Sequence, residues 1–189
     1  MTGIRFNQIL KDIKKLILFP VEFWREREHE EDDIKSLLIW YLLPLLFLLG
    51  LSVFLGEFFS GSHLYVVFPL LKAIRKIALF LIFYLISVLT VRVLINVLKF
   101  EKNRNKENQL TLFSFIPIIL ISILTGLFPF LYVINILGLY SFYIFWAGFS
   151  EFYDLSDRKK YKIIFLAFLV LFILFSFVSV LLSKLLTLL

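Results

Sequence analysis

The chain has 189 residues, of which 61% are hydrophobic, and carries a formal net charge of +6. A soluble domain averages about 45–50% apolar residues, and a fold of this size cannot bury such an excess. The composition therefore excludes an ordinary water-soluble protein, and the lack of cysteine excludes disulfides, thiolate metal sites and cysteine nucleophiles.

The first residues predict an amphipathic helix over Ile4–Phe19, which Pro20 ends because proline cannot continue a helix. We interpret this helix as lying in the plane of the membrane interface, with its basic face toward anionic lipid headgroups. That face carries Lys11, Lys14 and Lys15. The alternative is a helix packed on the protein's own cytoplasmic loops.

A run of mixed charge follows, from Arg25 to Asp33. Opposite charges at i,i+4 spacing, such as Arg27 with Glu31, are typical of a solvated helix. Residues 1–35 are therefore predicted to form a cytoplasmic N-terminal segment, and residues 36–189 a transmembrane domain.

Five later segments have about the 20 apolar residues that cross roughly 30 Å of hydrocarbon. They are Leu37–Leu55, Ile77–Leu98, Leu110–Phe128, Phe130–Phe149 and Ile163–Ser183. Pro44 is expected to kink the first, and Gly126 with Pro129 to form a tight hairpin between the third and fourth. The sequence thus predicts an all-α integral membrane protein with five transmembrane helices and an N-terminal amphipathic interfacial helix.

The connecting segments decide the orientation. They are predicted as a turn at Gly56–His63, an interfacial lead-in at Leu64–Lys76, and polar loops at Lys99–Gln109 and Glu151–Lys162. With five spans, the N-terminal segment and both polar loops share one side, which carries most of the basic residues. The positive-inside rule places the N-terminus in the cytoplasm and the C-terminus outside. The exception is the cluster Lys72, Arg75 and Lys76, which falls on the other side.

Arg92 and Asn96 lie one helical turn apart inside the second span. A charged residue in a span is a candidate contact for a lipid headgroup or a solute. Arg92 is also close enough to the end of the span for its side chain to reach the headgroups, or to hydrogen-bond a neighbouring helix. The sequence leaves both interpretations open.

Small and hydroxyl-bearing residues gather on single faces of the last two spans, where they let helices approach closely. They are Asn135, Gly138, Ser141 and Gly148 in the fourth span, and Ser176, Ser179 and Ser183 in the fifth. We predict helix packing at these faces. The alternative is a polar path, although nothing in these faces is ionisable, so a proton relay is not expected.

No arrangement of residues predicts catalysis or a cofactor. Glu57 with His63, and His29 among its acidic neighbours, lack any recognised metal-ligand spacing. No phosphate-binding glycine loop, nucleophile elbow or carboxylate pair occurs. Because the basic residues flank the spans, we expect anionic lipids as partners, and no nucleic acid.

Three motifs make the chain resemble the Yip-domain family, named for Ypt/Rab-interacting proteins. The first is KKLILFPVEFW at Lys14–Trp24, similar to the family's hydrophobic-Pro-x-x-Phe segment before the first span. The second is SFIPIILISILTGLFP at Ser114–Pro129, similar to its proline-bearing third span. The third is ILGLYSFYIFWAGFSEFY at Ile136–Tyr153, in which Tyr140 and Gly148 match the Leu-Tyr-x-x-x-hydrophobic-x-x-Gly signature best.

The resemblance implies five spans with a cytoplasmic N-terminus and no catalytic residues. Low glycine, many Lys, Ile and Phe, and a short N-terminal segment suggest a bacterial member in the cytoplasmic (inner) membrane. We expect a non-enzymatic protein of membrane organisation or a membrane-embedded interaction partner, forming homo-oligomers or binding another membrane protein. The alternative is a small transporter or channel for a lipid or small solute, which a cavity lined by Arg92 and Asn96 would favour.

Overall fold

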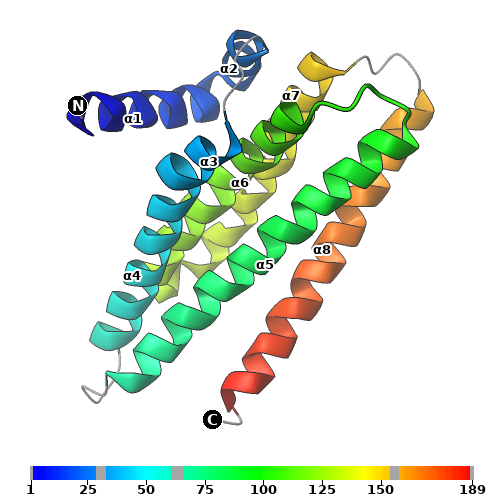
Figure 1. Ribbon diagram of the computed structural model, residues 1–189. Helices are drawn as coiled ribbons and strands as arrows, with labels where there is room; N and C mark the ends of the chain where they lie inside the picture. Colours follow the sequence, from blue (N-terminus) through cyan, green and yellow to red (C-terminus); the bar gives the residue numbers. More distant parts are fainter. Residues whose placement is uncertain (1, 29–32, 61–65, 154–157, 188–189) are drawn as a thin grey trace.

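The computed structural model describes residues 2–28, 33–60, 66–153 and 158–187, and over these ranges the chain forms helices and no strand. Five helical segments are long and apolar enough to cross a membrane, namely Ile34–Ser60, Val67–Val97, Arg104–Leu127, Pro129–Phe152 and Tyr161–Lys184. The predicted all-α fold with five spans is therefore confirmed. Two further helices, α1 (Thr2–Leu18) and α2 (Pro20–Arg27), lie across one end of the bundle, and α8 ends at the other (Figure 1).

The first span is built from three pieces. They are α3 (Ile34–Leu37), the π-helical turn η1 (Leu38–Leu42) and α4 (Leu43–Ser60). The π-helical turn lies just before Pro44. Proline has no N–H to donate and its ring crowds the carbonyl one helical turn earlier, so the regular hydrogen bonding of the helix is interrupted there. The irregularity expected at this proline is thus a widened turn in the helix.

The remaining spans follow in chain order. They are α5 (Val67–Val97), α6 (Arg104–Leu127), the 3₁₀ helix η2 (Pro129–Leu139) continued by α7 (Tyr140–Phe152), and α8 (Arg158–Thr187). Phe128 has non-helical backbone angles and Pro129 opens the next helix, so the chain turns between α6 and η2 at the predicted place.

Packing is very uneven across the bundle. The most apolar stretch of α6 is 56% buried and packs against α4, α5, η2 and α7, whereas that of α8 is only 11% buried. In Figure 1, α8 lies at the edge of the bundle beside α5, which is its main contact. α6 is therefore the centre of the domain, and α8 is the least buried span, with its backbone beside α5 and its Phe168 ring against Phe142 and Phe145 of α7.

The predicted connections are partly helical: α4 continues to Ser60 within the predicted turn Gly56–His63, and α8 begins at Arg158 within the predicted loop Glu151–Lys162. α5 begins at Val67, so most of the predicted lead-in belongs to one continuous helix, because Pro69 sits in its first turn where no N–H is needed. α6 begins at Arg104, inside the predicted polar loop. The Asn103 side chain caps it, accepting hydrogen bonds from the N–H groups of Asn105 (3.0 Å) and Lys106 (3.2 Å).

Two glycines predicted to make turns instead lie within helices where α4 crosses α6. A Cβ built on Gly56 would lie 1.9 Å from the carbonyl oxygen of Gly126. A Cβ on Gly126 would in turn lie 2.9 Å from the Ser52 hydroxyl. The two backbones approach this closely only because neither residue has a side chain, as in other tightly packed membrane helices.

Candidate functional site

A cavity of about 380 Å³ lies at membrane depth between α5, α6, η2–α7 and α8. Its lining is mainly apolar and includes several phenylalanines. Along α5 the lining residues run from Lys76 to Leu94, which corresponds to about 27 Å of helix at 1.5 Å per residue. The cavity is therefore long and narrow, parallel to the spans.

Apart from Lys76 and Asn135, the polar groups of the lining are hydroxyls, and most of these are already hydrogen-bonded. Thr90, Thr111 and Ser114 each donate to a carbonyl one turn earlier in their own helix, at 2.9, 2.8 and 2.6 Å. Ser87 is buried, and its hydroxyl has no partner among the described residues. The cavity thus offers an apolar ligand a suitable surface, with little to bind a strongly polar one.

One end of the cavity carries positive charge. Lys76 lines the cavity near the end of the bundle opposite α1, and Arg75 is its neighbour in α5. Lys72 forms an ion pair with Glu57 at 2.8 Å. Within the described part of the chain, no carboxylate lies within ion-pairing distance of Arg75 or Lys76. Among the described residues, therefore, no carboxylate neutralises the charges of Arg75 and Lys76.

Arg92 and Asn96 do not line this cavity, and the structure does not bring them together. Arg92 Nε lies 3.6 Å from Glu107 Oε2 of α6, whereas the Asn96 side chain is exposed. The Arg92 side chain is 41% exposed, whereas that of Glu107 is 5% exposed, so Arg92 is the cation beside a buried carboxylate. Sequence reasoning missed Glu107 because it expected that residue in a loop.

Glu107 belongs to a buried polar group at the start of α6. Glu107, Asn108 and Gln109 are each less than 5% exposed. Tyr153, just beyond α7, is also buried, and its burial, followed by the nearby Glu107 carboxylate, raises the pKa of its phenol. Tyr153 is therefore neutral at physiological pH.

Three small residues of the fourth span, Asn135, Gly138 and Ser141, face α6. Asn135 accepts a hydrogen bond from Thr125 (3.1 Å), and the Ser141 hydroxyl accepts one from the N–H of Ile118 (3.2 Å), next to Pro117 of α6. A Cβ on Gly138 would lie 3.3 Å from Ile118. These three residues line the cavity where η2 and α7 pack on α6.

The hydroxyl residues of α8 are divided between two surroundings. Ser179 lines the cavity, and Ser183 is half-buried. Ser176 is exposed and donates to the carbonyl of Phe172 at 3.0 Å. Of this predicted set, only Ser179 therefore belongs to the candidate site.

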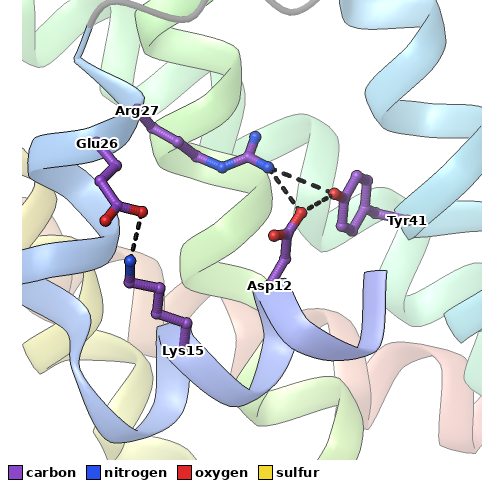
Figure 2. A network of polar contacts seen from close by, with 5 residues as sticks. All are labelled: Asp12, Lys15, Glu26, Arg27 and Tyr41. Atoms are coloured by element: carbon purple, nitrogen blue, oxygen red, sulfur yellow. Dashed lines mark hydrogen bonds and ion pairs between the residues drawn. The ribbon is translucent and has the colours of Figure 1, made fainter. Parts of the chain in front are cut away.

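The N-terminal segment is held to the bundle by a buried arginine. Arg27 is 7% exposed, and its guanidinium donates to Asp12 (2.9 Å) and Tyr41 (3.4 Å), as Figure 2 shows. Its Cζ also lies 4.3 Å from the centroid of the Phe113 ring. The prediction of a solvated charged run was wrong at this residue, because α2 turns it inward. Its predicted partner Glu31 lies outside the described residues, as do His29 and His63.

The predicted interfacial lysines of α1 differ in their surroundings. Lys11 and Lys14 are exposed, and Lys15 pairs with Glu26 of α2 (Figure 2). The apolar side of α1 is also divided, since Leu16 is fully buried and Leu10 is 50% exposed. α1 thus packs partly on the protein and leaves apolar and basic surface free; contact of its lysines with anionic lipid remains a prediction.

Replacing Asp12 by alanine should destabilise the protein by about 3–5 kcal/mol, because a buried guanidinium loses its carboxylate. The matched control is Lys15→Ala, which breaks the pair with Glu26, whose side chain is 66% exposed, and should cost under about 1 kcal/mol. Reversible unfolding in mixed micelles measures both. Equal losses of stability in the two variants would show that the burial of Arg27 does not make its ion pair with Asp12 more important than the exposed pair.

The same segment is anchored to α7 through Trp24. Its indole N–H donates to the carbonyl of Ile144 at 3.0 Å, and the side chain is fully buried. A Cβ on Gly148 would lie 2.5 Å from the indole ring, so only glycine leaves room for it. The Tyr140 hydroxyl donates to the carbonyl of Ile17 at 2.8 Å. Two segments far apart in sequence therefore meet in one interface.

The family model of the Yip1 domain matches residues 14–180, which is most of the chain. The chain belongs to the Yip1 domain family. No curated protein and no solved structure matches it.

The three motifs that carry the resemblance to the Yip1 domain have a common structural role. Trp24 of the first motif packs against Gly148 of the third, and Ser141 of the third bonds the backbone beside Pro117 of the second. The Yip1 domain thus begins within α1, and α2 is an integral part of it. Trp24, Gly148 and Ser141 therefore pack the three motifs against one another.

Proposed function

We propose that this Yip1-domain protein is a non-enzymatic, membrane-embedded binding protein that acts in membrane organisation. The observation that carries the proposal is the long apolar cavity beside α8. Protein interiors are normally close-packed, and small-molecule sites have volumes of about 300–1,000 Å³. A cavity in this range is more than a packing defect and suits an apolar ligand taken from the bilayer.

The packing of α8 supports lateral access to this cavity. α8 lies beside α5, contacts α7 through aromatic rings such as Phe168, and is 11% buried in its most apolar stretch, so it can shift without breaking the central packing on α6. A ligand dissolved in the membrane then reaches the cavity beside α8 without crossing water.

Transport of a lipid or small solute is the second candidate, favoured by the length of the cavity. At the end toward α1, however, its lining is formed by buried residues, among them Val91, Leu94 and Thr111. Arg92 and Asn96, which a solute path was expected to use, lie outside it. Binding is therefore the stronger proposal.

We further propose that the N-terminal end faces the cytoplasm and the C-terminal end the opposite side, as the positive-inside rule requires. We also propose that the protein resides in a bacterial cytoplasmic membrane and that it self-associates through the exposed face of α8. Anionic lipids are the partners that the basic surface of α1 favours.

The proposal is tested by thiol accessibility, because the chain has no cysteine of its own. Ser87→Cys places a thiol in the cavity, and Ser52→Cys places one at the α4–α6 crossing; both serines are about 95% buried. We expect a membrane-soluble alkyl maleimide to modify the first variant in bilayers and to leave the second unmodified. Equal protection of both thiols would contradict a ligand cavity that opens to the membrane.

A further inference from the structure

We propose that the cavity binds one acyl chain of an anionic phospholipid, whose phosphate lies at Lys76. This inference rests on the proposed function and names the class of ligand. It also assigns a role to the cluster Lys72, Arg75 and Lys76. This cluster is the exception to the positive-inside rule, because it lies on the side that carries few basic residues.

The shape of the cavity favours a lipid chain over a partner's helix. A transmembrane helix is about 10–12 Å across, so about 27 Å of it occupies on the order of 2,000 Å³. The cavity holds about 380 Å³. A single hydrocarbon chain is thin enough to enter, and the cavity is longer than one leaflet, about half of the roughly 30 Å hydrocarbon thickness.

The charge at one end favours an anionic headgroup. Lys76 lines the cavity, its Nζ lies 5.5 Å from the Phe80 ring centroid, and no described carboxylate neutralises it. Lys72, one turn earlier, is neutralised by Glu57, so the free charge is concentrated at Arg75 and Lys76. A phosphate at this position offsets one of these two positive charges while its acyl chain contacts Leu79 and Phe83 farther in.

The middle of the cavity fits the same ligand. Ser87 is the described lining residue whose buried hydroxyl has no partner, and the surrounding side chains are chiefly phenylalanine and leucine. Contact with apolar methylene groups suits this surface, and the isolated hydroxyl forms no site for a second charged group.

The experiment uses the purified full-length chain, stripped of lipid in detergent, and counts bound phospholipid by native mass spectrometry. Phosphatidylglycerol, phosphatidylcholine and inorganic phosphate are the probes. We expect one saturable phosphatidylglycerol, weaker phosphatidylcholine binding, and no competition from phosphate alone. Competition by phosphate equal to that of the lipid would overturn the role of the acyl chain.

Two pairs of variants locate the lipid. Ser179→Phe fills the cavity, whereas Ser176→Phe places the same ring on the exposed side of α8. Only Ser179→Phe should abolish phosphatidylglycerol binding, with thermal unfolding showing that both variants fold. Retained binding in Ser179→Phe would exclude this cavity as the site.

The second pair tests the headgroup. Lys76→Gln should weaken phosphatidylglycerol binding about fivefold, as expected for the loss of one cation near an anionic lipid. Lys102→Gln removes an equal charge from an exposed loop at the other end and should leave binding unchanged. If Ser179→Phe blocks both lipids while Lys76→Gln has no effect, the phosphate assignment fails and the proposed function stands. If neither lipid binds the wild-type chain, the proposed function itself fails.

Discussion

Replacing Gly56 by alanine is expected to destabilise the membrane domain by more than about 3 kcal/mol, the upper end of ordinary overpacking. The new Cβ would lie 1.9 Å from the backbone oxygen of Gly126, which no change of side-chain rotamer can relieve. α4 and α6 would have to separate at the most extensively packed helix pair of the bundle. The free energy of unfolding in mixed micelles measures the effect.

Gly50→Ala is the matched control in the same helix. Its Cβ would meet the end of the Ile77 side chain at 2.5 Å, and that flexible group can move aside. We expect a loss under about 1 kcal/mol, partly offset by the better helix propensity of alanine. Similar losses for the two variants would refute the close backbone crossing.

Replacing Trp24 by alanine is expected to release the N-terminal segment from α7. Removal of a fully buried tryptophan costs about 3–5 kcal/mol, which corresponds to an increase in local opening of about 100-fold to several thousand-fold. The side chains of Lys11 and Lys14 are already exposed, but trypsin needs the helical backbone to open, so the rate of cleavage in α1 should rise by the same factor. The spans themselves should remain folded.

Two controls separate anchoring from general damage. Trp24→Phe keeps an aromatic ring and loses the hydrogen bond to Ile144, which costs about 1 kcal/mol. Trp146→Ala removes a half-buried tryptophan stacked on Tyr161, away from α2, and should not change cleavage of α1. If Trp146→Ala accelerates cleavage as much as Trp24→Ala, the anchoring role of Trp24 is wrong.

The candidate site was only partly predictable. Sequence patterns identified Ser141 and Ser179 as residues of helix faces, yet gave no reason to separate Ser179 from Ser176. They directed attention to Arg92 and Asn96, because charge in a span is unusual. The lining of a cavity depends on how far four helices stand apart, and no local pattern reports that distance.

What the sequence by itself determined is the class of the protein, its five spans and its family. Hydrophobic length decides the class and the spans, because a bilayer accepts only backbone whose polar groups are satisfied within the helix, and three motifs indicate the family. Tertiary structure alone decided three other features. Arg27 is buried because α1 supplies Asp12, Gly56 is a crossing point because Gly126 lies opposite, and Lys76 lines a cavity because α8 packs loosely. Each depends on a partner remote in sequence, whose position is set only by packing.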